Sequence, residues 1–101
     1  MAMYYLYVLA SRHHKHLSIG VTGDLAGGIS ARRTLTNRKL KRKRVMQKLV
    51  YVEALHSIDE AVEREIRLKK ANRREIDELV ESVNPSWDSI SVSGLVRAGF
   101  D

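Results

Sequence analysis

Tyr4-Tyr-Leu-Tyr-Val-Leu9 and Leu17-Ser-Ile-Gly-Val-Thr22 are the two segments that establish the fold class of this chain. The first is a run of aromatic and aliphatic residues with the length of a buried β-strand. The second alternates larger apolar residues with small ones, which also predicts a strand. The polar residues 11–16 between them have the length of a hairpin connection. We therefore expect two antiparallel strands at the start of a sheet.

One helix and a third strand are predicted in the middle of the chain. Asp24 is a suitable N-cap for a helix that runs to about Arg33. Gly27 and Gly28 weaken this helix, because a glycine inside a helix costs about 1 kcal/mol relative to alanine. Residues 48–55, Lys-Leu-Val-Tyr-Val-Glu-Ala-Leu, have the pattern of a strand. The basic residues before it predict an exposed loop or a frayed extension of the helix.

Two further helices are marked by capping sequences. Ser57-Ile-Asp-Glu60 is a capping box that opens a helix to about Ala71. The same pattern in Asn72-Arg-Arg-Glu75 opens a shorter helix to about Val83. Pro85 prevents that helix from continuing, because proline lacks the backbone N–H of a helical residue.

The predicted elements define one small domain. Their order is β-β-α-β-α-α, which predicts an α+β sandwich with a three-stranded antiparallel sheet packed against helices. A length of 101 residues is typical of one domain with one core. We expect Trp87 to fold back on that core. The domain is predicted to span residues 1–91, with a C-terminal tail over residues 92–101.

Composition and charge narrow the class of protein. The chain has no cysteine, which excludes disulfides and thiolate metal sites, and no apolar run near the ~18–20 residues of a membrane span. We therefore expect a soluble, cytoplasmic protein with no membrane partner, and its oligomeric state stays open. Residues 1–50 carry +10 and residues 51–101 carry −4 of the formal charge of +6. A basic half favours a polyanionic partner, most often nucleic acid, with an acidic protein or an anionic membrane surface as the alternatives.

Short motifs in these elements resemble those of the GIY-YIG nuclease family. Tyr5-Leu6-Tyr7 and, ten residues later, Ser18-Ile19-Gly20 are similar to the paired motif that names the family. The likeness spans residues 3–91 in the family's order. It is greatest to small stand-alone bacterial members and to the nuclease module of the excision-repair incision protein, which implies a role in DNA repair. The other similar segments are residues 21–25, 49–53, 61–69 and 84–87.

The resemblance implies hydrolysis of DNA phosphodiester bonds with one divalent metal ion, Mg²⁺ or Mn²⁺. By matching position, Glu65 would hold the metal, and Tyr7 would help to activate water. Gly20 and Asn84 match family positions that support the site. Such hydrolysis needs a metal ion to neutralise developing charge and polarise the phosphate. We expect Tyr7 and Glu65 to lie together at the mouth of one positively charged groove.

Three positions depart from the family pattern. The tyrosine of the second motif is Ser18, the arginine of the first helix is Gly28, and a polar residue one turn later is Arg32. Loss of an arginine that stabilises a phosphoryl transition state costs about 10³–10⁵ in rate. Arg32 lies one turn beyond Gly28 and its side chain leans toward the helix N-terminus, so it is a candidate displaced phosphate ligand. We predict a nuclease architecture with weak or lost activity, the alternative being a non-catalytic nucleic-acid-binding domain.

A run of basic residues is the candidate contact for nucleic acid. Phosphate contacts of this kind are independent of base sequence and sensitive to salt. The alternatives are a solvated loop and a face that docks an acidic protein partner. The predicted nucleic-acid-binding residues are Arg32, Arg33, Arg38, Lys39, Lys41, Arg42, Lys43 and Arg44.

Several candidate residues also have structural interpretations. Glu65 can pair with Lys69 or a neighbouring arginine, and Tyr7 is suited to a core position with a satisfied hydroxyl. The spacing of three histidines in the predicted hairpin connection does not fix a tetrahedral metal site, so an exposed polar turn is the better interpretation. These histidines are His13, His14 and His16.

Overall fold

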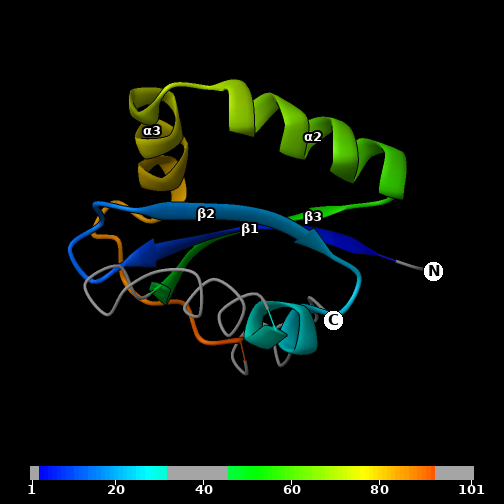
Figure 1. The fold of residues 1–101 in the computed structure, drawn as a ribbon, viewed down its shortest axis with the longest axis horizontal. Coiled ribbons are helices and arrows are strands. Elements are labelled where there is room, and N and C mark those ends of the chain that lie inside the picture. Colours follow the sequence, from blue (N-terminus) through cyan, green and yellow to red (C-terminus); the bar gives the residue numbers. More distant parts are fainter. Residues whose placement is uncertain (1–2, 32–45, 93–101) are drawn as a thin grey trace.

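A three-stranded antiparallel sheet forms the middle layer of the molecule (Figure 1). The computed structural model describes residues 3–31 and 46–92. Strand β1 (Tyr4–Ser11) lies between β2 (Leu17–Thr22) and β3 (Met46–Leu55). The three predicted strands and the α+β class are confirmed. The first and third strands are each two residues longer than predicted.

Strand β1 is buried along most of its length because it is the central strand and both of its faces are covered. Its continuous apolar run follows from this position, since a strand buried on both faces needs no polar alternation. Successive side chains still point to opposite faces of the sheet and therefore belong to two separate core clusters. Leu6, Val8 and Ala10 belong to one cluster, and Tyr5, Tyr7 and Leu9 to the other.

Helices α2 (Ile58–Lys70) and α3 (Arg73–Val83) cover the first face of the sheet (Figure 1). Leu68 of α2 packs in the same cluster as Leu6 and Val8 of β1. Ile76 and Val80 of α3 complete that contact. The predicted order β-β-α-β-α-α is confirmed, with the last two helices on one side of the sheet.

Both predicted capping sequences form. Ser57 Oγ accepts a hydrogen bond from the Glu60 N–H at 3.2 Å, and Asn72 Oδ1 accepts one from the Glu75 N–H at 2.9 Å. These bonds satisfy backbone donors that have no partner inside the helix. In the first box the reciprocal bond is displaced by one residue, because the Glu60 carboxylate accepts from the His56 N–H.

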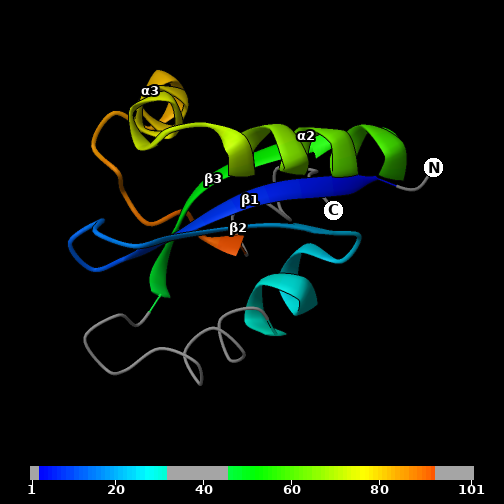
Figure 2. The same cartoon turned by 45° about the horizontal axis from the view of Figure 1, so that its top comes forward.

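The other face of the sheet carries a short helical segment, residues 25–31 (Figure 2). Asp24 is its N-cap, as predicted, since Oδ1 accepts a hydrogen bond from the Gly27 N–H at 3.2 Å. Leu25 and Ile29 of the segment are fully buried against Tyr5, Tyr7 and Leu9. The predicted continuation to Arg33 and the predicted loop after it lie outside the described residues.

The chain after α3 returns to the sheet. Trp87 is 6% exposed and belongs to the cluster under α2 and α3, which confirms the expected position of its side chain. The Ile90 N–H then donates to the Leu49 carbonyl of β3 at 2.7 Å. Ile90 and Val92 pack against the cluster on the opposite face. The rest of the predicted tail lies outside the described residues, and the predicted domain boundary stays a prediction.

Candidate functional site

Tyr7 and Gly20 are neighbours across the β1–β2 ladder. The two residues are paired in the antiparallel register, and both are buried. The Tyr7 side chain is 3% exposed and lies in the cluster with Leu25 and Ile29. Tyr7 therefore occupies a core position, as its structural interpretation predicts. The predicted role of its hydroxyl in activating water stays a prediction.

Glu65 lies on α2 at the edge of the face that packs on the sheet. It is spaced four residues after the buried Ala61 and three before the buried Leu68, and residues with these spacings share a helix face. Its side chain is 23% exposed, and a carboxylate oxygen lies 3.4 Å from Lys69 Nζ. The ion pair with Lys69 confirms one of the expected alternatives. The same carboxylate remains partly open to solvent.

Tyr7 and Glu65 lie in different layers of the molecule. Tyr7 points away from α2, because the side chains of β1 that meet α2 belong to the alternate set. Glu65 is carried by α2 itself, above the opposite face of the sheet (Figure 1). The described part of the chain therefore does not place this phenol and this carboxylate in one core cluster.

A surface cavity of about 430 Å³ lies where β2 meets α2 and α3. Ser18, the residue in place of the second-motif tyrosine, is part of its wall. Its floor is largely aliphatic, and its two charged lining residues are both cations, Lys69 and Arg73. Lys69 is also the ion-pair partner of Glu65, so this carboxylate lies beside the cavity. Ser18 is paired with Leu9, so its side chain is directed to the other face of the sheet. The other lining residues are Leu17, Ile19, Leu68, Ala71 and Ile76.

Glu65 is chemically suited to a divalent ion. Mg²⁺ is commonly held by one or two carboxylates together with water and substrate phosphates. A carboxylate that is partly open to solvent fits this role, although a bound ion would compete with Lys69 for it. Within residues 3–31 and 46–92, no group of three or more histidine, aspartate or glutamate side chains is arranged to hold a metal ion. A metal at Glu65 would therefore depend on water and substrate for its other ligands.

The space beside Gly28 is filled by Thr22. A Cβ placed on Gly28 would lie 2.5 Å from Thr22 Cβ and 2.9 Å from Thr22 Cγ2, closer than carbon atoms approach without something moving. The Thr22 side chain is held in place, because its hydroxyl accepts from the Asp24 N–H at 3.1 Å and donates to the Asp24 carbonyl at 2.9 Å. The helical segment thus packs on the end of β2 at a distance that only glycine permits.

Asn84 joins three backbone groups at the end of α3. Its Nδ2 donates to the Val50 carbonyl at 2.9 Å and to the Asp88 carbonyl at 3.0 Å, while Oδ1 accepts from the Asp88 N–H at 3.0 Å. The side chain thereby links α3 to β3 and to the following turn. Its predicted support of a site stays a prediction.

The predicted phosphate ligand Arg32 and the predicted nucleic-acid-binding residues lie outside the described part of the chain. They are Arg32, Arg33, Arg38, Lys39, Lys41, Arg42, Lys43 and Arg44. Their roles remain predictions from the sequence. The helix from which Arg32 would project begins as expected at Asp24.

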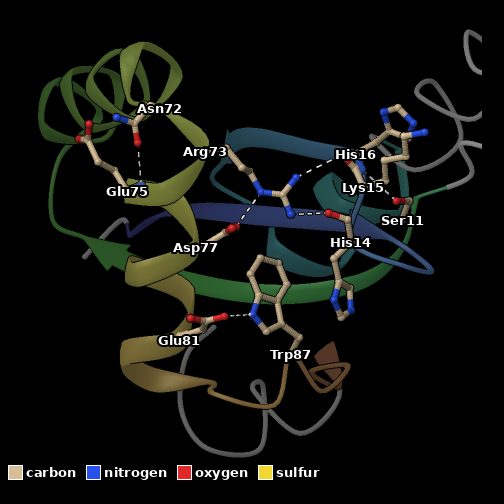
Figure 3. Close-up of polar contacts among 10 residues, drawn as sticks. All are labelled: Ser11, His14, Lys15, His16, Asn72, Arg73, Glu75, Asp77, Glu81 and Trp87. Atoms are coloured by element: carbon tan, nitrogen blue, oxygen red, sulfur yellow. Dashed lines mark hydrogen bonds and ion pairs between the residues drawn. The ribbon is translucent and has the colours of Figure 1, made fainter.

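Arg73 binds the hairpin connection between β1 and β2 (Figure 3). Its guanidinium donates to the backbone carbonyls of His14 and Lys15, and its Nε lies 2.6 Å from Asp77 Oδ1. The sequence does not signal the two carbonyl contacts, because they join residues nearly sixty positions apart. They fix the first turn of α3 beside the hairpin and keep Arg73 at the cavity wall.

Trp87 contacts both His14 and Arg73 (Figure 3). The imidazole and indole rings stack with their centroids 4.8 Å apart, and Arg73 Cζ lies 5.7 Å from the indole centroid. Trp87 Nε1 donates to Glu81 at 2.8 Å. His14 and Trp87 both have a positive φ, 60° and 55°, a conformation that costs such residues about 1–2 kcal/mol. The contacts of Trp87 therefore hold two strained turns together.

The surroundings of His14 disfavour its charged form. Burial, then the nearby charges of Lys48 and Arg73, lower the pKa of the imidazole below its usual 6.5. Lys48 Nζ lies 3.1 Å from Nε2, an arrangement that requires the neutral ring as acceptor. His14 thus belongs to the packing of the hairpin rather than to an exposed polar turn.

A second polar cluster joins β3 to α2. Arg64 donates to both carboxylate oxygens of Glu53, at 2.9 and 3.2 Å, and the Tyr51 hydroxyl donates to Glu53 at 2.6 Å. Burial and the carboxylate raise the pKa of Tyr51 to about 12. This phenol therefore stays protonated near neutral pH, and the cluster serves to attach α2 to the sheet.

No helix in the described part of the chain is long and apolar enough to cross a membrane.

Comparison with known proteins agrees with the motifs in the sequence. The model of the GIY-YIG catalytic domain matches residues 3–77. Among solved structures, the chain is similar to the UPF0213 protein BH0048 from Bacillus halodurans, determined in solution by NMR, with 26% sequence identity and a TM-score of 0.56. That match covers 84% of this chain and 89% of the other. No curated protein matches the chain at a significant level.

Proposed function

We propose that this chain, which belongs to the GIY-YIG catalytic-domain family, binds DNA and hydrolyses its phosphodiester bonds only slowly. Membership of a nuclease family supports a nucleic-acid substrate. The cation-lined cavity at the junction of β2 and α2 supports its location. The slow rate is inferred from the residues that replace the family's tyrosine and arginine.

The packing of Thr22 on Gly28 is the observation that carries this proposal. The space in which an arginine side chain would begin is occupied by a threonine that is itself hydrogen-bonded to Asp24. A missing arginine at a phosphoryl transition state lowers the rate by about 10³–10⁵. Ser18 adds a second loss, since a short aliphatic hydroxyl is less acidic than a phenol and reaches less far.

Glu65 is the residue to which we assign the divalent ion. A bound Mg²⁺ or Mn²⁺ would neutralise phosphate charge and lower the pKa of a coordinated water. Lys69 would then be released from Glu65 and would face the phosphates from the cavity wall. Arg73 supplies a second cation there, already oriented by Asp77. Tyr7 has no part in this proposal, because its side chain is buried on the face of the sheet opposite α2.

The cleavage test compares two glutamates of the same helix. Supercoiled, branched and single-stranded DNA are incubated with the protein and Mg²⁺ or Mn²⁺. We expect slow cleavage that Glu65→Gln abolishes and that the matched variant Glu63→Gln, exposed on the same helix, leaves unchanged. Cleavage that survives Glu65→Gln would assign the activity to a contaminant or to another site.

The binding test uses salt dependence. We expect DNA affinity to fall steeply as salt rises, and Lys41, Arg42 and Lys43 replaced together by alanine to reduce both the affinity and the slope. Arg74→Ala is the control, because that side chain is 88% exposed on α3 and lies outside the basic run. A salt-independent affinity, or no binding at moderate salt together with binding of an acidic protein, would reject the proposal.

A further inference from the structure

Helix α2 exposes a row of large apolar side chains. Ile58, Val62 and Ile66 are 53%, 43% and 49% exposed and are spaced by four residues, so they form one row along the helix. The face that packs on the sheet is a different one and buries Ala61 and Leu68. Three aliphatic residues in one exposed row indicate a surface that is covered in an assembly.

Charged residues beside this row change sign along the helix. At 3.6 residues per turn, Asp59, Glu63, Arg67 and Lys70 fall within about 80° of one another on one side of the row. The two acids lie in the N-terminal half and the two cations in the C-terminal half. The helix dipole favours this order of charges, but it does not account for the apolar row.

We infer that two copies of this chain associate through antiparallel α2 helices, with Val62 and Ile66 of the apolar row beside the two-fold axis and Ile58 at the edge of the interface. A two-fold axis brings one side of the helix against the same side of its partner in the reverse direction. Asp59 then faces Lys70 of the partner subunit, and Glu63 faces Arg67 of the partner subunit. The two helix dipoles also oppose each other.

The parallel arrangement lacks this complementarity. It would place each acid against the same acid of the other copy, and each cation against the same cation. A cleft of about 310 Å³ lies on the side of α2 that carries Glu63 and Arg67, and side chains of the partner could enter it. The cleft is lined by Leu55, Glu60, Glu63, Arg64 and Arg67.

The interface is small, so the dimer is expected to dissociate on dilution. A single helix–helix contact lies at the low end of specific interface sizes. Glu65 lies on the opposite side of the row from Glu63, so the candidate metal residue is not one of the paired charges. Association is therefore independent of DNA cleavage and is tested without DNA.

Sedimentation of the full chain over a concentration series tests the dimer. We expect monomer at about 1 μM and a large dimer fraction at about 100 μM, as for weak complexes. Val62→Glu abolishes the dimer, because the two copies would bury two carboxylates at its centre. The control Val83→Glu makes the same change at a 68% exposed position of α3 and leaves the dimer intact.

Charge exchange and cross-linking test the antiparallel orientation. Glu63→Arg and Arg67→Glu each raise the dissociation constant about tenfold, and the double variant restores it, as complementary charges require. Because the chain has no cysteine, Asp59→Cys and Lys70→Cys report orientation directly. When the two cysteine variants are mixed, we expect a disulfide between them to form far faster than either variant forms a disulfide with its own copy.

Three results would overturn the inference. The first is a monomer at all concentrations up to about 1 mM, beyond any specific weak dimer. The second is a dimer that Val62→Glu leaves unchanged. The third is a cysteine variant that couples to itself as fast as to the other. A monomer that nevertheless cleaves DNA would reject the dimer alone and leave the proposed function standing.

Discussion

The two capped helices α2 and α3 cover one face of the sheet, whereas the other face carries only the short helical segment 25–31 among the described residues. The first face is held by side chains that reach across the molecule, such as Arg73 to the hairpin and Arg64 to Glu53. On the second face, Thr22 and Gly28 meet at close range. The comparison indicates that long side chains join the first face to the sheet, whereas the second face is joined by close packing at a glycine.

Trp87→Ala is expected to have the largest effect, because it removes the centre of the first face. Replacing a buried tryptophan by alanine costs about 3–5 kcal/mol, and the stacking with His14 and Arg73 is lost as well. Urea unfolding followed by circular dichroism measures the change, since the chain has no other tryptophan. Trp87→Phe, which keeps an aromatic ring but loses the bond to Glu81, should lose less. A loss below about 1 kcal/mol for the alanine variant would mean that the contacts of Trp87 do not stabilise the packing of the first face.

Gly28→Ala tests the packing of the second face. A helix normally gains about 1 kcal/mol from this change, but here the new Cβ meets Thr22, and we expect a net loss of about 1–3 kcal/mol. Adding Thr22→Gly should recover most of the loss, which makes the two substitutions strongly non-additive. Unfolding free energies of the four proteins give the coupling.

Gly27→Ala is the matched control for that cycle. A Cβ at Gly27 meets the carboxylate of Asp24, which can move aside at the cost of its cap bond to the Gly27 N–H, about as much as the helix gains from alanine. We therefore expect a smaller loss than at Gly28. A stabilised Gly28→Ala would contradict the packing, and would also mean that Gly28→Arg with Ser18→Tyr can restore the family's groups without any change at Thr22.

Removing one N-cap on each face compares how much the same kind of hydrogen bond contributes to the stability of the two faces. Asn72→Ala on the first face and Asp24→Ala on the second each remove one side-chain bond to a helix N–H, at a typical cost of about 1 kcal/mol. Equal losses in urea unfolding would mean that both helices unfold with the whole domain. A much smaller loss for Asp24→Ala would mean that the segment 25–31 detaches before the sheet unfolds.

His14 should give the first face a small dependence on pH. Its pKa is lower in the folded state than in the unfolded chain, so folding is favoured while the ring is neutral. The contribution is present above pH 6.5 and is lost as the pH falls through the lower pKa of the folded state. His14→Phe keeps a ring against Trp87 and should flatten the stability profile between pH 5 and 8. A profile identical to that of the natural chain would assign the dependence to other groups.

The secondary structure was predictable because its signals are local. A capping side chain bonds a backbone N–H three residues ahead, so Ser57, Asn72 and Asp24 could each be identified from a few neighbours. The apolar run of β1 and the alternation in β2 likewise depend on nearby residues. The motif order was sufficient to predict the family, and the match over residues 3–77 confirms it.

The candidate site was less predictable because its geometry depends on layers. Because side chains alternate along a strand, Tyr7 and Leu6 must point to opposite faces of the sheet. The alternation does not indicate which of the two faces packs against α2. From the order of the motifs we expected Tyr7 and Glu65 to lie together, but the fold puts them in different layers. Lys69 was foreseen as a partner of Glu65 because the pair is four residues apart, whereas the contacts of Arg73 with the hairpin gave no local signal.

Short-range patterns in this chain thus determined its strands, its helix starts, its basic half and its family, since each follows from residues close together along the backbone. Packing between distant segments determined the rest. Only in three dimensions does Thr22 fill the space beside Gly28, Trp87 contact both His14 and Arg73, and a cavity gain its two cations from α2 and α3. These contacts depend on the distance between layers, which no single segment encodes.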